Sequence, residues 1–458
     1  MSAGSGALPS DRWGTGQPAR NRSGLAQRPP RWDLLRVAMV ATLWCYVWRV
    51  QDLVPLLGKA KVPVLISLMA IGLFSLSSGA MQVLGRLRHP VLKLASLVLL
   101  LMILSVPTSL YQGMSVAFIR DDFLKTFIML LLLVATARGA VDVERYAAAQ
   151  VLGGVIYAGF VLTRFKVDAS GRLGSLEYYD ANDLAMLLVG TVPLILYFLR
   201  RGAPKRMRVA ALVAMGTYLI TIERTGSRGG FLGLIAVALF LLLTFRALPA
   251  RVRLGSVVGA ALILGVVASD RYWNMMQTLL HIREDYNWSG HADEGRMEVW
   301  KRGLGYMWQR PLTGVGVQAF TTAEGTISPI AQRQDYGEGL KWSAAHNALV
   351  QIGAELGVPG LLAFVALIVV AFRTMGRVSR HRPDDTPERR SEAAMAQALR
   401  ACLVGYCVTA FFLSQAYAAY LYSLLGLVTA VSVLSRVRRD GPLAMPGWRT
   451  PTGPGIQG

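Results

Sequence analysis

The residue best suited to carry chemistry is His346, which lies at a sharp polar-to-apolar transition in HNALVQIGAELGVPG (residues 346–360). Ser343 can cap a helix start just before it, which would place His346 in the first helical turn. The positive end of a helix dipole disfavours a protonated imidazole. A neutral imidazole can accept a proton, as a general base must. Gly357 and Pro359 predict a corner, since glycine stops helices and proline suits a first turn. The alternative is a histidine that only caps or packs at a membrane surface.

Three arginines could bind an anion near this histidine. Arg224 and Arg228 lie in ERTGSRGG, and Arg296 opens a helical segment later in the chain. Arginine holds phosphate through charge-assisted, bidentate hydrogen bonds. Ser227 can cap the helix that follows it, and a helix N-terminus also favours anions. The alternative is that these arginines bind lipid headgroups or extend to the membrane interface.

A second polar motif, EYYDANDLA, carries Asp180, Asn182 and Asp183. These side chains could bind sugar hydroxyls, or they could simply cap the helix that begins here. Arg172 precedes them in the same loop and is a further candidate anion contact. The sequence therefore leaves both substrate binding and helix capping open for these side chains.

Charged residues also occur at the predicted outer end of the fourth apolar segment. Asp121 and Asp122 come just before Lys125, which would lie inside that segment. An unpaired charge there is costly, and either acid could be its partner. No spacing of His, Cys, Asp or Glu completes a metal site, so we expect neither a metal nor another cofactor.

The composition bounds the class of protein. Of 458 residues, 53% are hydrophobic and 16% are charged, and the mean hydropathy is +0.42. These values are typical of a polytopic membrane protein. A formal charge of +21 would suggest nucleic acid in a soluble protein. Here the lysines and arginines fall mainly between apolar segments, so membrane topology explains them and we expect no nucleic acid partner.

The apolar segments predict an all-α fold of about twelve transmembrane helices. They lie at 33–50, 62–79, 90–110, 119–137, 145–163, 181–199, 208–222, 229–245, 254–269, 358–373, 397–413 and 416–435. Arginines are concentrated in alternate loops, and the positive-inside rule then places both termini in the cytoplasm. The long polar insert after residue 269 falls on the opposite side, between the ninth and tenth helices.

This topology predicts five regions. A disordered cytoplasmic tail (1–32) precedes nine helices (33–269), and a periplasmic loop with interfacial helices (270–357) is followed by three helices (358–435) and a cytoplasmic tail (436–458). Residues 294–309 in the loop place Met297, Trp300, Leu304 and Met307 on one helical face. Such a face predicts a helix that lies on the membrane surface.

These features together resemble the O-antigen ligase and Wzy-type polysaccharide polymerase superfamily, from about residue 35 to 435. Its members have about twelve spans, a large late periplasmic loop, and a His-Asn, His-Ser or His-Gln pair that nine residues separate from Gly-x-x-Gly. Here His346 and Asn347 form the pair, and Gly357 and Gly360 follow at that spacing. The ligase pattern usually continues with Thr, where this chain has Leu361.

The resemblance implies a metal-independent, inverting glycosyltransferase of the bacterial inner membrane. The donor would be a glycan on undecaprenyl diphosphate at the periplasmic face, held by Arg228 and Arg296 and helped by Arg224. His346 would take the proton of the acceptor hydroxyl. Ser227 and Asn347 would contribute to substrate binding.

The acceptor separates several alternatives. A ligase moving the glycan onto lipid A–core is the first, a Wzy-type O-antigen or exopolysaccharide polymerase the second, and a protein O-oligosaccharyltransferase the third. A lipid-linked glycan flippase or transporter belongs to a different class and should hold its key residues near the bilayer midplane. If the chain is an enzyme, we expect Arg228, Arg296 and His346 to converge on one cavity, within about 15 Å of one another.

Overall fold

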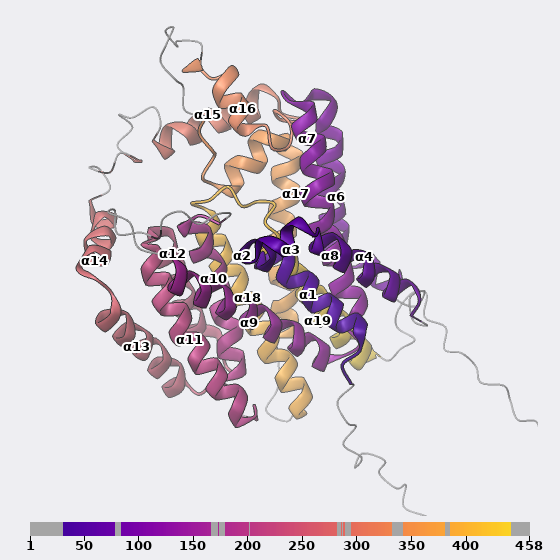
Figure 1. Cartoon of the computed structure of the whole chain (residues 1–458), viewed down its shortest axis with the longest axis vertical. Coiled ribbons are helices and arrows are strands. Elements are labelled where there is room, and N and C mark those ends of the chain that lie inside the picture. Colours follow the sequence, from indigo (N-terminus) through magenta and orange to yellow (C-terminus); the bar gives the residue numbers. More distant parts are fainter. Residues whose placement is uncertain are drawn as a thin grey trace, which may run out of the picture. The chain divides into compact units, whose positions relative to one another are not determined.

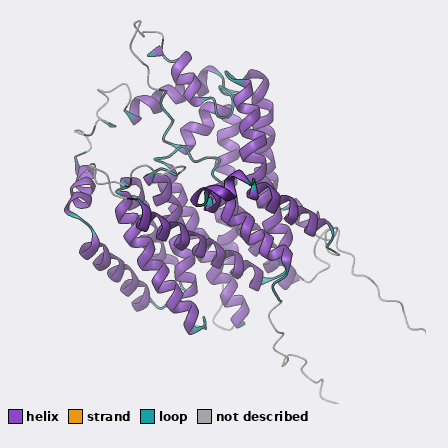
Figure 2. Cartoon of the chain, viewed as in Figure 1, coloured by secondary structure: helices purple, strands orange, loops and turns teal. Residues whose placement is uncertain are grey.

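The computed structural model describes residues 31–77, 84–165, 173, 179–200, 202–281, 285, 287–288, 295–331, 342–380 and 385–440. Within these ranges the regular elements are helices (Figure 2), as the sequence predicts. The chain divides into two units, Met1–Trp32 and Asp33–Gly458, and all the helices labelled in Figure 1 belong to the second. The predicted tail falls almost wholly outside the described residues.

Each of the twelve predicted apolar segments coincides with a helix. The matching helices are α1 (Leu34–Val47), α4 (Val62–Ser75), α6 (Pro90–Ser105), α8 (Leu124–Thr136), α9 (Ala140–Arg164), α10 (Ala181–Phe198), α11 (Lys205–Thr225), α12 (Arg228–Thr244), α13 (Ala250–Val267), α17 (Ala348–Val378), α18 (Pro387–Ala410) and α19 (Ala419–Asp440). In the described part of the chain, seven helices are long and apolar enough to cross a membrane: α6 with its following turn, α9, α10, α13, α17, α18 and α19. The chain is therefore a membrane protein with several spans, and the count of twelve stays a prediction.

Shorter helices complete the connections. These are α2 (Val50–Leu53), α3 (Pro55–Lys59), η2 (Leu84–Arg88), η3 (Val106–Thr108), α7 (Gln112–Phe118), α14 (Asp270–Gln277), η5 (Thr278–Leu280), α15 (Arg296–Gln309) and α16 (Phe320–Thr326). A π-helical turn, η4 (Ile119–Phe123), joins α7 to α8 without a break. Helices α15 and α16 contact α17, and Figure 1 shows them at the same end of the view as α7.

Helix α10 is the most deeply buried, and every side chain from Leu184 to Phe198 is buried. Glycines let its neighbours approach closely, as small residues do in membrane bundles. A Cβ at Gly190 would lie 2.5 Å from the hydroxyl of Tyr420 in α19, and one at Gly233 in α12 would lie 2.4 Å from Thr409 in α18. Helices α10, α12, α18 and α19 therefore form the core that carries the polar regions described below.

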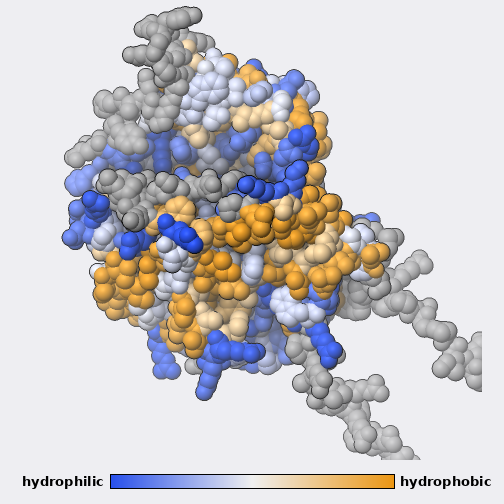
Figure 3. Space-filling view, viewed as in Figure 1, coloured by the Kyte–Doolittle hydropathy of each residue, from blue (hydrophilic) through white to orange (hydrophobic). Residues whose placement is uncertain are grey.

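The outer helices differ sharply from this core. Helix α13 exposes Leu262 and Val266, of which Val266 is 86% exposed. In water such a surface would be unfavourable, whereas lipid tails are as apolar as these side chains. Hydrophobic residues gather in a band on one face of the molecule, with hydrophilic residues beyond it (Figure 3). The pattern agrees with a protein that lies in a bilayer.

Helix α17 bends at Gly357, which has φ 69° and ψ −167°. The predicted corner is confirmed, because Gly357 adopts a left-handed φ that other residues avoid. The bend frees two carbonyl groups, and the segment after α15 bonds them: Val315 N–H donates to Ala354 (2.8 Å) and Gly316 N–H to Glu355 (3.0 Å). The bend is thus held by backbone hydrogen bonds from the neighbouring loop.

Helix α15 packs on the first part of α17 through a face that the sequence did not predict. Its buried residues are Val299, Gly303, Tyr306 and Met307, whereas Leu304 is 43% exposed. The reason is Gly303, where a Cβ would lie 2.5 Å from Val350 of α17. Close approach at this glycine turns the helix away from the face with the bulkier apolar side chains.

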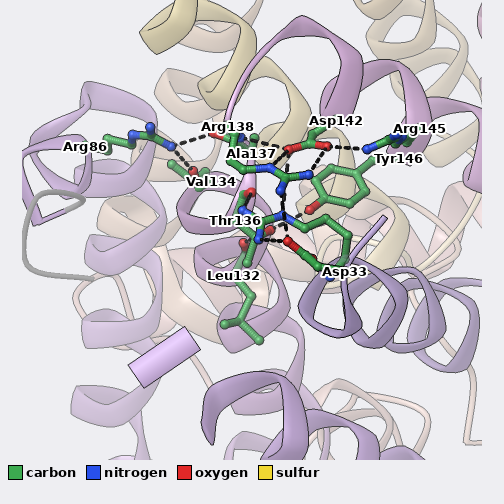
Figure 4. Close-up of polar contacts among 11 residues, drawn as sticks. Asp33, Arg86, Leu132, Val134, Thr136, Ala137, Arg138, Asp142, Arg145 and Tyr146 are labelled. Carbon is green, nitrogen blue, oxygen red and sulfur yellow. Dashed lines mark hydrogen bonds and ion pairs between the residues drawn. The ribbon is translucent and has the colours of Figure 1, made fainter. Parts of the chain in front are cut away.

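A buried charge cluster joins the ends of α1, α8 and α9 (Figure 4). The Asp142 carboxylate is fully buried and accepts hydrogen bonds from Arg138 (2.7 Å) and Arg145 (3.0 Å), with Arg36 3.7 Å away. Arg36 also donates to the carbonyl of Thr136 at the end of α8 (2.8 Å). Cations near the C-terminus of a helix are favourable, so this cluster stabilises the junction of three helices.

Candidate functional site

The turn between α11 and α12 places Arg228 at the first residue of α12. Gly226 ends α11 with φ 57°, which glycine adopts without strain. Ser227 is the N-cap, and its hydroxyl accepts a hydrogen bond from Gly230 N–H (3.1 Å), which confirms the predicted cap. The N-terminus of this 17-residue helix carries free N–H groups and a positive dipole end, and both favour an anion.

Arg228 and Arg296 line one cavity of about 270 Å³. Its wall consists of Asn182, Gly226, Ser227, Arg228, Gly229, Gly230, Met275, Thr278, Arg296, Thr409, Phe412 and Leu413. Arg296 reaches the cavity because it begins α15, as predicted. Two guanidinium groups, a helix N-terminus and the Asn182 amide make a cavity suited to a diphosphate or another dianion.

The glycines of this turn serve packing as well as the cavity. A Cβ at Gly229 would lie 3.3 Å from Phe412, and one at Gly230 would lie 2.7 Å from Ala185. These glycines bring the start of α12 against α10 and the loop after α18, which fixes where Arg228 stands.

Arg228 has a carboxylate partner that the sequence did not reveal. Its guanidinium bonds Asp285 and donates to the hydroxyl of Thr278 (3.0 Å). Burial by itself would raise the pKa of Asp285, but hydrogen bonds from Asn287 and Arg228 lower that pKa below its ordinary value. Asp285 is therefore ionised at neutral pH, and a bound anion must share or replace it as the partner of Arg228.

His346 stands just before α17 rather than in its first turn. The helix begins at Ala348, and Asn347 is the N-cap, whose side chain accepts from the N–H groups of Leu349 (2.8 Å) and Val350 (3.1 Å). The expectation that Ser343 caps this helix is wrong, because the asparagine nearer the helix makes those bonds. His346 itself has a left-handed φ of 45°.

Two contacts fix His346 relative to the arginine cavity. Its N–H donates to the hydroxyl of Ser414 (2.8 Å), which directly follows the cavity residues Phe412 and Leu413. The indole of Trp300, one turn after Arg296 in α15, donates to the carbonyl of Ala345 (2.9 Å). His346 does not line the cavity, so the expected convergence of all three residues on one cavity is not met. It is, however, joined to two of the segments that form the cavity.

An aromatic cluster strengthens this junction. Trp300 packs against Trp288 and Phe411 with ring centroids 5.3 and 5.2 Å apart, and Trp288 also contacts Phe412 at 6.3 Å. Edge-to-face pairs of this kind add to the energy of burial. The cluster connects the segment before α15, α15 itself and the loop after α18.

A second, larger cavity lies on the other side of the loop that carries Ser414. Its volume is about 580 Å³, and Ser414 and Gln415 line it. Other polar lining residues are Tyr46, Arg49, Gln51, Asp52, Lys61, Asp121, Asp122, Lys125, Tyr179, Asp183, Gln318, Gln351, Tyr417 and Tyr420. The loop from Phe412 to Gln415 therefore separates an arginine cavity from a cavity of mixed charge with aromatic walls.

The remaining predicted site residues have different positions. Asn182 lines the arginine cavity, whereas Asp183 lines the second cavity and accepts from Gln415 (2.7 Å). Asp180 caps α10 by accepting from Asn182 and Asp183 N–H, so the capping alternative describes its contacts. Arg224 is half exposed, lies near Glu223 (3.6 Å) and does not line the arginine cavity. Arg172 lies outside the described residues.

Several residues at the site have no role in the sequence-based prediction: Ser414, Gln351, Gln415 and Arg49 line the second cavity, and Asp285 pairs with Arg228. Gln351 and Gln415 lie just outside predicted apolar segments, among mostly apolar neighbours, and that setting was a usable signal. No such signal marked Asp285, which lies among other polar residues. Across the described ranges, no group of three or more His, Cys, Asp or Glu residues could hold a metal ion.

Comparison with known families gives one finding for this region. Residues 210–365 match the O-antigen ligase family, a range that runs from α11 past the bend of α17 and contains Arg228, Arg296 and His346. The resemblance to the O-antigen ligase and Wzy-type superfamily is thereby confirmed. The family indicates a glycosyltransferase-like membrane enzyme with lipid-linked glycan substrates. A search of curated proteins gives no match.

Proposed function

Because residues 210–365 match the O-antigen ligase family, we propose that the chain is an inverting glycosyltransferase of the bacterial inner membrane. Its donor is a glycan on undecaprenyl diphosphate, and its acceptor is a hydroxyl group. The observation that carries the proposal is the cavity shared by Arg228 and Arg296 at the start of α12. Two guanidinium groups beside a helix N-terminus match the charge of a diphosphate.

In the proposed reaction His346 accepts the proton of the acceptor hydroxyl while that oxygen attacks the anomeric carbon. The bond from this carbon to the diphosphate oxygen breaks, and its electron pair leaves with the diphosphate. Arg228 and Arg296 stabilise the negative charge that grows there. Attack opposite the leaving group inverts the anomeric centre. Since the arginines supply the positive charge, the reaction as proposed uses no metal.

The acceptor sugar is proposed to occupy the second cavity. Tyrosine rings and glutamine amides, such as Tyr417, Gln351 and Gln415, offer the stacking faces and hydrogen bonds that sugars use. Ser414 lines this cavity and also accepts the N–H of His346. The proposal thus puts His346 where donor and acceptor meet, at the loop between the two cavities.

Transfer onto lipid A–core, the ligase reaction, is our first proposal for the acceptor. The charge of the second cavity favours a second candidate, a Wzy-type polymerase. Its cations, Arg49, Lys61 and Lys125, are matched by at least as many carboxylates, among them Asp52, Asp121 and Asp122. A cavity with no surplus of positive charge does not attract phosphorylated sugars. It can accommodate the neutral sugars of a second lipid-linked repeat unit.

The test is a deletion strain complemented with wild-type protein or with His346→Ala. We expect the variant to reach the membrane and to leave the surface glycan absent. Long lipid-linked chains would accumulate if the protein is a ligase, and single repeat units would accumulate if it is a polymerase. A wild-type surface glycan in the His346→Ala strain would contradict the proposed role of His346.

A further inference from the structure

A third cavity lies at the opposite end of α12 from the arginine cavity. It has a volume of about 790 Å³, and the last residues of α12 line it together with α17 and α18. Helix α12 has 17 residues, so its two ends are about 25 Å apart. That separation approaches the thickness of the hydrocarbon core of a bilayer. The third cavity therefore lies near the membrane surface that the topology assigns to the cytoplasm.

Five arginines line this cavity, and no acidic residue does: Arg246, Arg373, Arg377, Arg380 and Arg400. In the part of the chain that the structure describes, no carboxylate pairs with any of the five. A group of like charges is destabilising unless an opposite charge joins it. The net positive charge of this cavity thus favours the binding of an anion that is not part of the described chain.

Arg400 is held in the wall of the cavity by aromatic rings. Its guanidinium lies 4.4 Å from the ring centroid of Phe372 and 5.4 Å from that of Phe240. These cation–π contacts fix the side chain, but its Nε has no hydrogen-bond partner. Gly376 leaves space beside it, since a Cβ there would lie 3.7 Å from the guanidinium carbon.

A second polar group in the wall also has no partner. Gln397 is one turn before Arg400 in α18 and is only 4% exposed, and its Oε1 makes no hydrogen bond. Buried polar groups in proteins are normally bonded. An amide oxygen accepts hydrogen bonds, so Gln397 suits a ligand that carries a hydroxyl, or a bridging water, beside its negative charge.

The rim of the cavity is apolar and faces outward. Leu243 lines the cavity and is 79% exposed, and Leu239 stands one turn earlier on the same face of α12. On α17, Val365 and Val369 are exposed at spacings of four residues before Arg373. A ligand with acyl chains could lay them along these two rows while its headgroup enters the cavity.

We propose that this third cavity binds a phosphate-bearing ligand. An anionic phospholipid is the ligand that best matches its apolar rim. Basic cavities between helices at the cytoplasmic surface suit lipid headgroups with more than one phosphate. Arginine forks bind phosphate oxygens in pairs. The same three helices reach the site of Arg228 and His346: α12 begins at Arg228, α17 begins just after His346, and α18 ends before the loop that carries Ser414. A bound lipid would therefore stabilise the helices that carry that site.

The test uses the full chain purified in detergent, with binding followed by native mass spectrometry and by the shift in melting temperature. The probes are cardiolipin (two phosphates), phosphatidylglycerol (one), phosphatidylcholine (zwitterionic) and free pyrophosphate. The variant is Arg373→Gln/Arg377→Gln, at the exposed end of α17. The matched control is Arg206→Gln/Arg251→Gln, two exposed arginines outside the cavity.

We expect wild-type protein and the control to bind cardiolipin more tightly than phosphatidylglycerol, with no shift from phosphatidylcholine. The double variant should bind cardiolipin at least about tenfold more weakly, since charge-assisted hydrogen bonds are lost. If pyrophosphate raises the melting temperature as much as cardiolipin does, the phosphate site is supported and its ligand is a soluble anion rather than a lipid. Equal binding of every anionic probe by wild type and double variant would overturn the proposal.

Discussion

Two groups of arginines in this protein differ in the surroundings of their guanidinium groups. Around Asp142 (Figure 4), three arginines share one fully buried carboxylate, and one of them, Arg36, also donates to the carbonyl of Thr136 at the end of α8. In the cavity at the start of α12, Arg228 has Asp285 as a partner but still borders about 270 Å³ of open volume with Arg296. The first group stabilises the fold, whereas the second is arranged for a ligand.

The position of an arginine in the sequence does not distinguish these two groups. Both groups lie near helix ends, where the sequence alone permits snorkelling, headgroup binding or catalysis. What separates them is whether the guanidinium groups also line a cavity that a ligand could enter, as Arg228 and Arg296 do. Opposite phenotypes follow for the two groups, with loss of stability at one and loss of transfer at the other.

The largest expected effect is at Arg228. Arg228→Ala should lower the rate of glycan transfer by about 10²- to 10³-fold, as for loss of one donor to a developing charge. The melting temperature should fall by an amount similar to that in Asp285→Asn, since both variants lose the ion pair between Arg228 and Asp285. Arg224→Ala is the matched control, since Arg224 lies outside the cavity and should retain most activity. Transfer rates of the purified variants in detergent would check this, and equal losses in both would refute the distinction.

Asp142→Asn should produce the reverse phenotype. Removing the carboxylate leaves three arginines without their shared buried acceptor, which typically costs about 3–5 kcal/mol of stability. We expect a lower melting temperature and lower yield, but normal transfer per folded molecule. An unchanged melting temperature would show that the cluster is not structural.

A smaller effect is expected at the contact that positions Arg296. Gly303→Ala places a methyl group 2.5 Å from Val350, and overpacking of this kind costs about 1–3 kcal/mol. Because α15 must shift, transfer should fall together with stability. Gly305→Ala is the control, since no atom lies within 4 Å of its added Cβ. Similar behaviour of the two variants would argue against the packing of α15 on α17.

The smallest effect concerns pH and Asp285. Its pKa is lowered in the folded protein, so the ion pair with Arg228 adds stability above the unfolded value of about 3.9 and loses it as pH falls through the lower folded pKa. Wild type should therefore melt above Asp285→Asn at pH 7, with the difference shrinking below about pH 4. A difference that grows on acidification would contradict the assigned ion pair.

Much of the fold could be predicted from the sequence because the relevant signals are local. Long apolar runs mark helices, and Gly357 marks the bend. Ser227 marks the start of α12. The start of α17 was placed too early because two residues, Ser343 and Asn347, could cap it, and only the hydrogen bonds decide between them.

The candidate site was predictable only in part. His346, Arg228 and Arg296 were identifiable from residue type, topology and family spacing. Their arrangement was not, because it depends on contacts distant in sequence. The bond from His346 to Ser414 joins residues 68 positions apart, and that between Trp300 and Ala345 spans 45. The division into two cavities follows from the loop that holds Ser414, and no local pattern marks it.

The central claim is that the arginines hold the donor and His346 acts on the acceptor. One measurement tests it directly: donor binding and single-turnover transfer by purified wild type, His346→Ala and Arg228→Ala/Arg296→Ala, with a defined undecaprenyl-diphosphate glycan. We predict that His346→Ala binds the donor with wild-type affinity but transfers nothing measurable, whereas the double-arginine variant binds it much more weakly. Wild-type transfer by His346→Ala, or wild-type donor binding by the arginine variant, would contradict the account.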